Sequence, residues 1–367
     1  MISSKDVYHV VAATIPLYVA MILSYTSVKW WKLFTPEQCG GINKFVAKFS
    51  IPLLSFQIIS ANNPYNMSLR LLLADSVQKL LAIVLIGVVT RFWFRGWRLS
   101  LVITGLSLST LPNTLILGVP VLKAMYGGEA ESLLSQIVFL QSIVWYNFLL
   151  FLFEVNAAMA VTANPSPEVA GGNHRDGSDQ GESKDGAAEH EQEASENRGR
   201  EVKKTVMSIL IIVGSKLIRN PNFYATSIGF IWACIHFRWG IKLPDVIDNS
   251  IMILATGGLG MAMFSLGLFM ASRATATACR IRMVDVAAMA MKFVAGPALM
   301  ALSSVVVGLR GRVLRVAIVQ AALPQGIVPF VFAKEYNVHP DVLSTSVIFG
   351  MLIGLPISLV YYSLLAF

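Results

Sequence analysis

The chain has 367 residues, of which 55% are hydrophobic and only 14% are charged. A soluble globular domain carries about 25% charged residues, so this composition excludes an ordinary soluble protein. A helix needs about 20 apolar residues to cross the hydrocarbon core of a bilayer, and ten such spans would use about 200 residues. The composition therefore predicts an all-α polytopic membrane protein.

The formal net charge is +8, with a pI near 9.4. The basic residues stand at the ends of apolar stretches and form no patch interleaved with aromatic residues. Membrane topology therefore explains them better than nucleic-acid binding. Cys39, Cys234 and Cys279 lie far apart without a CxxC pair, which argues against a disulfide framework and a zinc site. No histidine cluster indicates a metal, and we expect neither metal nor cofactor.

Apolar runs between charge clusters and Gly, Pro or Asn breaks predict ten spanning helices, five in residues 1–162 and five in residues 205–367. Between these halves, residues 163–204 are rich in acidic residues, Gly and Ser and contain no aromatic residue. This composition is typical of a disordered linker. The predicted spans are residues 8–30, 43–61, 70–91, 99–124, 133–155, 220–238, 247–271, 284–308, 313–334 and 341–366.

Lys and Arg cluster on alternate connections, at residues 29–48, 91–98, 203–219 and 273–282. Cytoplasmic connections of membrane proteins carry an excess of Lys and Arg. We therefore expect the linker to be cytoplasmic and both termini to be non-cytoplasmic, although the three arginines between residues 310 and 315 argue the other way.

Two proline-containing segments recur at matching places in the halves. The fourth span reads Leu111-Pro112-Asn113 followed by Val119-Pro120, and the ninth reads Leu323-Pro324-Gln325 followed by Val328-Pro329. An odd number of spans per half makes the repeat inverted. Proline removes a backbone donor and clashes with the preceding turn, so each proline pair should break its helix. Lipid cannot satisfy the freed groups, and broken helices in both halves indicate a transport site where the two spans cross. Packing kinks are the alternative, which the repetition disfavours.

A broken helix presents free N–H groups and the positive end of its dipole, which attract anions. Asn113 and Gln325 can add donors, or can simply cap the broken ends. An apolar wall, an aromatic face and one further polar contact would suit a flat hydrophobic carboxylic acid, although core packing is the alternative for each apolar side chain. These side chains are Ile51, Leu115, Ile116, Ile327, Val328, Tyr146 and Gln141.

Asp75 and Lys79 stand four residues apart on one face of the third span. An ion pair lowers the cost of burying either charge in a membrane. Two interpretations stay open: a coupling role, in which Lys79 replaces a cation or Asp75 carries a proton, and a static pair that ties helices together. In the eighth span Lys292 lies deep, without a partner that the sequence identifies.

Four runs together resemble the plant PIN-FORMED auxin efflux carriers: residues 111–115, 220–224, 258–270 and 323–330. The resemblance covers both halves and implies export of the indole-3-acetate anion or a related aromatic carboxylate. It also implies ten helices, an elevator-type motion and a homodimer in membrane lipid, without nucleic acid. By resemblance, Asn113 and Asn222 lie near the carboxylate, Ile51, Tyr146, Ile327 and Val328 form the pocket wall, and Asp75 with Lys79 forms a support site.

The linker departs from the pattern of plasma-membrane family members, because it is far shorter and poor in serine. This favours the short-loop group of the endoplasmic reticulum, with the plasma membrane as the alternative. The rival functions are a sodium- or proton-coupled organic-anion symporter and a non-transporting signalling or scaffold protein. An enzyme is disfavoured, because the spans contain no paired catalytic Asp residues and no Ser/His constellation.

Overall fold

The computed structural model describes residues 4–93, 98–163, 207–208, 211–212, 214–216, 218–273 and 283–365. Within these residues the chain is helical and has no strand, and its one β-like feature is an isolated antiparallel bridge between Pro112 and Gln325. Apart from Ala163, the predicted linker lies outside the described residues. The fold is therefore an all-α one, as the composition predicted.

Six helices are long and apolar enough to cross a membrane, judged by length and composition. They make the protein a helical membrane protein. Three shorter apolar helices accompany them, at Ile15–Lys29, Leu99–Thr110 and Thr114–Tyr126. The six long helices are Pro36–Ser60, Leu69–Phe92, Gly128–Met159, Asp245–Ala271, Met283–Val307 and Pro340–Leu364.

The helices of the first half follow the predicted spans closely, with π-helical turns inside three of them. They are α1 (Ser4–Lys29), α2 (Pro36–Phe45), η1 (Val46–Ser50), α3 (Ile51–Ser60), η2 (Pro64–Asn66), α4 (Leu69–Trp93), α5 (Leu99–Thr110), η3 (Thr114–Gly118), α6 (Val119–Tyr126), α7 (Gly128–Leu140), η4 (Gln141–Trp145) and α8 (Tyr146–Ala163).

In the second half, α10 (Pro221–Trp239) starts at a capped turn, in which the Asn220 side chain accepts from the N–H of Asn222 and Pro221 occupies the first turn. It is followed by α11 (Asp245–Arg273), α12 (Met283–Ala290), η6 (Met291–Ala295), α13 (Gly296–Val307), α14 (Gly311–Ala321), α15 (Ile327–Glu335) and α16 (Pro340–Leu364).

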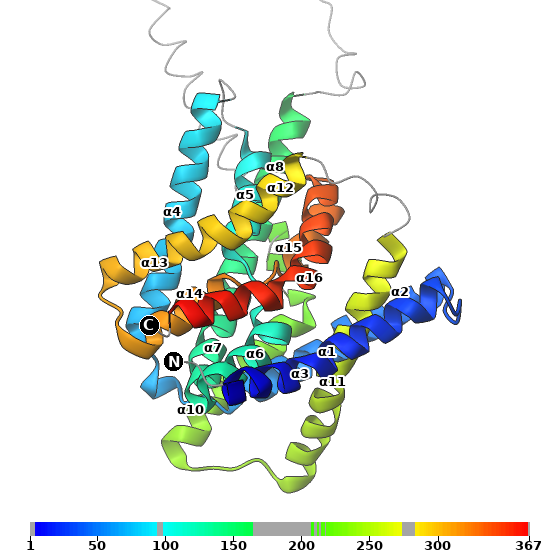
Figure 1. Ribbon diagram of the computed structural model, residues 1–367, viewed down its shortest axis with the longest axis vertical. Helices are drawn as coiled ribbons and strands as arrows, with labels where there is room; N and C mark the ends of the chain where they lie inside the picture. Colours follow the sequence, from blue (N-terminus) through cyan, green and yellow to red (C-terminus); the bar gives the residue numbers. More distant parts are fainter. Residues whose placement is uncertain are drawn as a thin grey trace, which may run out of the picture.

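One group of helices is built around α11, which packs against α1 and α3, while α3 also packs against α10. Gly267 permits the close approach of α11 to α1, because a Cβ there would lie 2.1 Å from the Met21 carbonyl oxygen. The Ser24 hydroxyl donates to the Phe264 carbonyl at 2.6 Å across the same contact. Figure 1 shows α1, α3 and α11 together on one side of the molecule.

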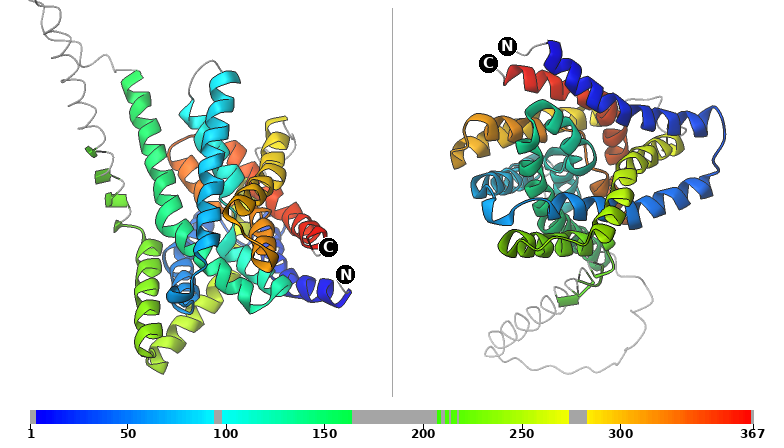
Figure 2. Two further views of the ribbon diagram at one scale, coloured as in Figure 1. Left: turned by 90° about the vertical axis from the view of Figure 1, so that its left-hand side faces the viewer. Right: turned by 90° about the horizontal axis from the view of Figure 1, so that it is seen from below.

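A second group holds the broken helices. Here α4 packs against α5 and α13, α13 against α14, and α15 against α16 and α8. In both views of Figure 2, α1 begins close to where α16 ends. Fully buried apolar side chains of this group lie on both sides of the helix breaks, on α5 to α8 and on α14 to α16. They include Ile103, Leu106, Leu111, Leu117, Leu122, Leu134, Ile137 and Leu149.

Candidate substrate site at the crossing of two broken helices

The two broken helices meet through their main chains. Between α5 and η3, and between α14 and α15, short segments run antiparallel to each other. The N–H of Asn113 donates to the Pro324 carbonyl at 2.8 Å, and the N–H of Gly326 donates to the Leu111 carbonyl at 2.9 Å. These bonds satisfy main-chain groups that have no helical partner, which a lipid environment requires.

The second proline of each pair behaves differently from the expectation that both would break the helix. Pro329 lies in the first turn of α15, whereas Pro120 lies inside the continuous helix Thr114–Tyr126, where the π-helical turn η3 passes into α6. Proline is tolerated in a first turn because the N–H that it lacks would have no helical acceptor there. Each break therefore belongs to Pro112 or Pro324, and the second proline of each pair lies within the helix that continues after the break.

A cavity of about 660 Å³ lies beside this crossing. Its volume falls within the usual range for small-molecule sites. The residues that the sequence and the resemblance assign to substrate binding line this cavity. Gln325, the further amide expected at the crossing, does not line the cavity and is fully buried. Those lining residues are Ile51, Asn113, Gln141, Tyr146, Asn222, Ile327 and Val328.

Two amide side chains offer free donors at the cavity. The Ser55 hydroxyl donates to Oδ1 of Asn222 at 2.8 Å, which orients that amide and leaves its NH₂ group available. The Nδ2 of Asn113 is buried and has no hydrogen-bond partner among the described residues. A buried unsatisfied donor costs about 1–3 kcal/mol, which an anion accepting from it would offset. The pair can therefore bind a carboxylate without a cationic side chain.

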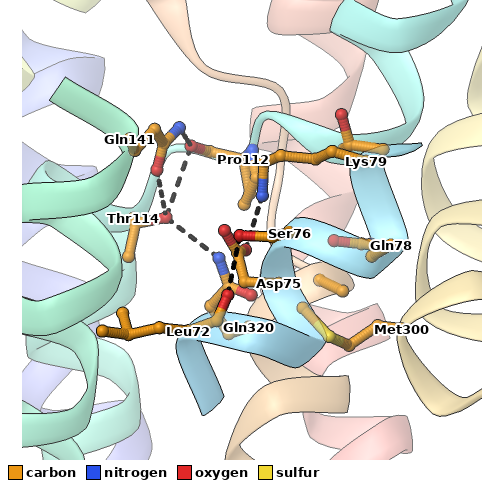
Figure 3. A network of polar contacts seen from close by, with 12 residues as sticks. Leu72, Asp75, Ser76, Gln78, Lys79, Pro112, Thr114, Gln141, Met300 and Gln320 are labelled. Carbon is orange, nitrogen blue, oxygen red and sulfur yellow. Dashed lines mark hydrogen bonds and ion pairs between the residues drawn. The ribbon is translucent and has the colours of Figure 1, made fainter. Parts of the chain in front are cut away.

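Gln141 is fully engaged inside the protein. Its Nε2 donates to the Pro112 carbonyl at 3.0 Å and to the Tyr146 hydroxyl at 2.9 Å, and its Oε1 accepts from Thr114 at 3.1 Å. Thr114 in turn accepts from Gln320 at 3.2 Å, so the network joins the two broken helices (Figure 3). Gln141 thus positions the crossing and the Tyr146 ring.

Four charged residues also line the cavity, and the sequence analysis did not identify them: Lys48, Lys216, Arg219 and Glu335. The Nζ of Lys216 lies 2.8 Å from Glu154 and 3.0 Å from Glu335, and it contacts the Tyr336 hydroxyl. Burial lowers the pKa of Lys216, but its hydrogen bonds to Glu154, Tyr336 and Glu335 outweigh that effect and raise the pKa above its ordinary value. Lys216 therefore stays protonated, and the cavity lining is basic overall.

Asp75 and Lys79 form a buried ion pair outside the cavity lining. The Nζ of Lys79 lies 2.5 Å from the Asp75 carboxylate, and it lies 5.3 Å from the centre of the Trp145 ring. Figure 3 shows this pair and the Gln141 network near Pro112. Lys292, whose partner could not be identified from the sequence, donates to the Ala321 carbonyl at 3.2 Å, at the end of α14.

A helical membrane protein whose substrate-sized cavity lies at two broken helices belongs to the class of membrane transport proteins. Residues 9–362 match the family described as Membrane transport protein. The chain is 57% identical to auxin efflux carrier component 8 of Arabidopsis thaliana over 370 residues, covering all of both chains. It is 44% identical to probable auxin efflux carrier component 5a of Oryza sativa subsp. japonica, covering all of this chain and 99% of the relative.

The chain therefore belongs to the PIN-FORMED family of auxin efflux carriers, and it is a transporter and not an enzyme. Its alignments with the two relatives above extend over 370 and 371 residues, which matches the short-loop members. The chain is 34% identical to auxin efflux carrier component 1 of Arabidopsis thaliana, and the alignment covers both chains completely. That alignment extends over 622 residues because the relative is much longer than this chain.

Proposed function

We propose that this protein exports the indole-3-acetate anion, or a closely related aromatic carboxylate, by alternating access. One observation supports this most directly: a single cavity combines free amide donors on Asn113 and Asn222 with an apolar and aromatic wall. The two relatives described above are auxin efflux carriers by name.

In this proposal the carboxylate accepts hydrogen bonds from Asn113 and Asn222, and the indole ring lies against Ile51, Tyr146 and Val328. Ile327 completes the wall. The basic side chains of Lys48, Lys216 and Arg219 raise the local concentration of anions. No covalent bond is made or broken in this cycle, so transport needs only binding, motion and release.

The proposed motion is an elevator in which the group built around α4, α13 and the crossing moves against the group built around α11. The packing of each group supports this division. Two inverted repeats of five spans each would place Lys79 and Lys292 at corresponding positions of the two halves. Lys79 precedes Pro112 by 33 residues, and Lys292 precedes Pro324 by 32 residues. A homodimer, residence in the endoplasmic reticulum and a cytoplasmic linker complete the proposal, and these rest on the family resemblance and the charge distribution.

We further propose uniport, driven by the anion gradient and the membrane potential, which is worth about 2.3 kcal/mol per charge at 100 mV. The test is flux of labelled indole-3-acetate in vesicles containing the purified chain, at clamped pH with and without sodium. Uniport predicts equal flux in both media and a response to the imposed potential. Flux that requires sodium or a proton gradient would indicate a symporter instead.

The assignment of the site is tested in the same vesicles with Asn113→Ala. Losing a hydrogen bond to a charged group costs about 1.5–3 kcal/mol, so flux at low substrate concentration should fall about tenfold or more. Asn66→Ala, which removes an exposed amide in η2, is the matched control and should leave flux unchanged. Absence of flux in every medium would exclude indole-3-acetate as the substrate and favour a signalling or scaffold role.

A further inference from the structure

A second cavity lies at the beginning of α4, away from the crossing. Its volume is about 540 Å³, and it is enclosed by the start of α4 and by the turn that joins α13 to α14. None of its lining residues belongs to the first cavity. Figure 1 shows that α4 begins at the end of the molecule opposite to the end of α8, so the residues leading into the linker lie far from it.

This second cavity carries two positive charges. Arg70 and Arg310 both line it, both are exposed, and neither has an acidic partner in the part of the chain that the structure describes. No Asp or Glu lines the cavity. The neighbouring Arg312 differs, since its Nη1 lies 2.8 Å from the Glu129 carboxylate. Two guanidinium groups beside one hollow, without a counter-charge, favour an anionic ligand.

The main chain adds to this preference. Arg310 is the N-cap residue of α14, and its side chain makes no capping hydrogen bond. The first N–H groups of α14 and the positive end of its dipole therefore lie at the cavity. Guanidinium groups match the geometry of phosphate oxygens, and helix N-termini bind phosphate through their free N–H groups.

The surroundings of the cavity are apolar and exposed. Leu69 and Leu73 on α4 are 77% and 58% exposed, and Val305 and Val306 on α13 are 67% and 70% exposed. Both helices are long and apolar enough to span a membrane, and they pack against each other. These side chains would lie along the acyl chains of a lipid whose headgroup occupied the cavity, whereas a free phosphate ion would gain nothing from them.

We propose that the cavity between the start of α4 and the α13–α14 turn is a binding site for an anionic phospholipid. The phosphate lies between Arg70 and Arg310, and the acyl chains run along the exposed faces of α4 and α13. Because α4 carries the Asp75–Lys79 pair and α14 leads into the crossing, the bound lipid holds together two helices that support the transport site.

The test uses the full chain in nanodiscs of phosphatidylcholine, with or without phosphatidylglycerol. Phosphatidylglycerol should raise the midpoint of thermal unfolding, and native mass spectrometry should detect the retained lipid. Arg70→Gln and Arg310→Gln should each weaken lipid retention about tenfold and abolish the rise of the midpoint. Arg238→Gln, which removes an exposed arginine from the last turn of α10, should behave like the parent protein.

Inorganic phosphate added to discs of phosphatidylcholine alone separates the two sources of the anion. It should not raise the midpoint, because it lacks acyl chains. A rise that matches the effect of phosphatidylglycerol and requires both arginines would show a free-phosphate site and overturn the lipid proposal. Full retention of phosphatidylglycerol by the two glutamine variants, which are checked for folding by gel filtration, would overturn it as well.

Discussion

The main-chain N–H of Asn113 lies 2.8 Å from the carbonyl oxygen of Pro324, although these residues belong to opposite halves of the chain. The crossing is thus fixed by backbone atoms, which every residue type except proline supplies in full. Side chains near it can therefore differ in what they bind while the crossing keeps its geometry. Substitutions around the cavity should separate into those that weaken substrate binding and those that weaken the crossing itself.

Ser55→Ala should weaken substrate binding. The Ser55 hydroxyl donates to Oδ1 of Asn222 at 2.8 Å and fixes the orientation of that amide. Without the hydroxyl, the amide is free to rotate away from the substrate carboxylate. We expect KM for indole-3-acetate to rise about threefold to tenfold, in line with one neutral hydrogen bond, while the maximal flux is kept. Ser60→Ala, on the same helix, removes only a bond to the Gln57 carbonyl and is the control. Equal KM values for both variants would contradict this role.

Gln141→Leu should weaken the crossing. The substitution removes three buried hydrogen bonds, to Pro112, Tyr146 and Thr114, and should lower the free energy of unfolding by about 2–4 kcal/mol. Tyr146→Phe removes one of these bonds and keeps the ring, so it should cost about 1 kcal/mol. Denaturant titration in detergent micelles measures both values. Equal losses in the two variants would show that Gln141 does not organise the network.

Asp75→Asn should leave the buried Lys79 ammonium without its counter-charge, and breaking a buried pair on one side costs about 3–5 kcal/mol. The double variant Asp75→Leu with Lys79→Met removes both charges and should recover most of that stability. Thermal unfolding and vesicle flux are measured on the same samples. Recovered stability without flux would make the pair mechanistic, whereas recovery of both would make it a static tie between helices.

Lys216→Met should lower thermal stability by an amount that does not change between pH 6 and pH 9. The raised pKa of Lys216 means that its contribution is complete below the unfolded pKa of about 10.4 and is lost only as pH rises through the folded value. Melting curves across this range, extended above pH 10, check the prediction. Lys216→Arg keeps its charge and should follow the parent protein at neutral pH. A difference that shrinks between pH 7 and pH 9 would contradict the raised pKa.

Much of the fold follows from local pattern. The predicted span at residues 70–91 is α4 (Leu69–Trp93), and the one at residues 341–366 is α16 (Pro340–Leu364). Pro112 and Pro324 mark the breaks because the effect of proline on a helix acts within one turn. The same rule did not distinguish Pro120 and Pro329, since a proline that lies within a continuing helix has the same local sequence signature as one that ends a helix.

The remaining parts of the site depend on which helices pack together, and helix packing cannot be predicted from the local pattern of a single sequence. Ser55 and Asn222 meet only because α3 packs against α10. Lys216 reaches the cavity although it precedes the predicted sixth span and resembles a residue of a basic flank. Gln325, the second amide expected as a donor, does not line the cavity, and its buried amide has no hydrogen-bond partner among the described residues, so its role at the substrate stays a prediction. Elevator motion, dimerisation and ion coupling stay predictions.

The backbone bonds at the crossing also set an order of assembly. Leu111 and Asn113 are synthesised long before Pro324 and Gly326, which supply their hydrogen-bonding partners. During that interval the first broken helix has unpaired main-chain groups, and in the proposed ten-span arrangement these groups lie within the bilayer, where lipid offers them no partner. The nascent first half must therefore be shielded, by water or by other protein, until the ninth predicted span arrives. Biogenesis of this transporter should be most vulnerable in that interval, and the substrate site should be the last part to form.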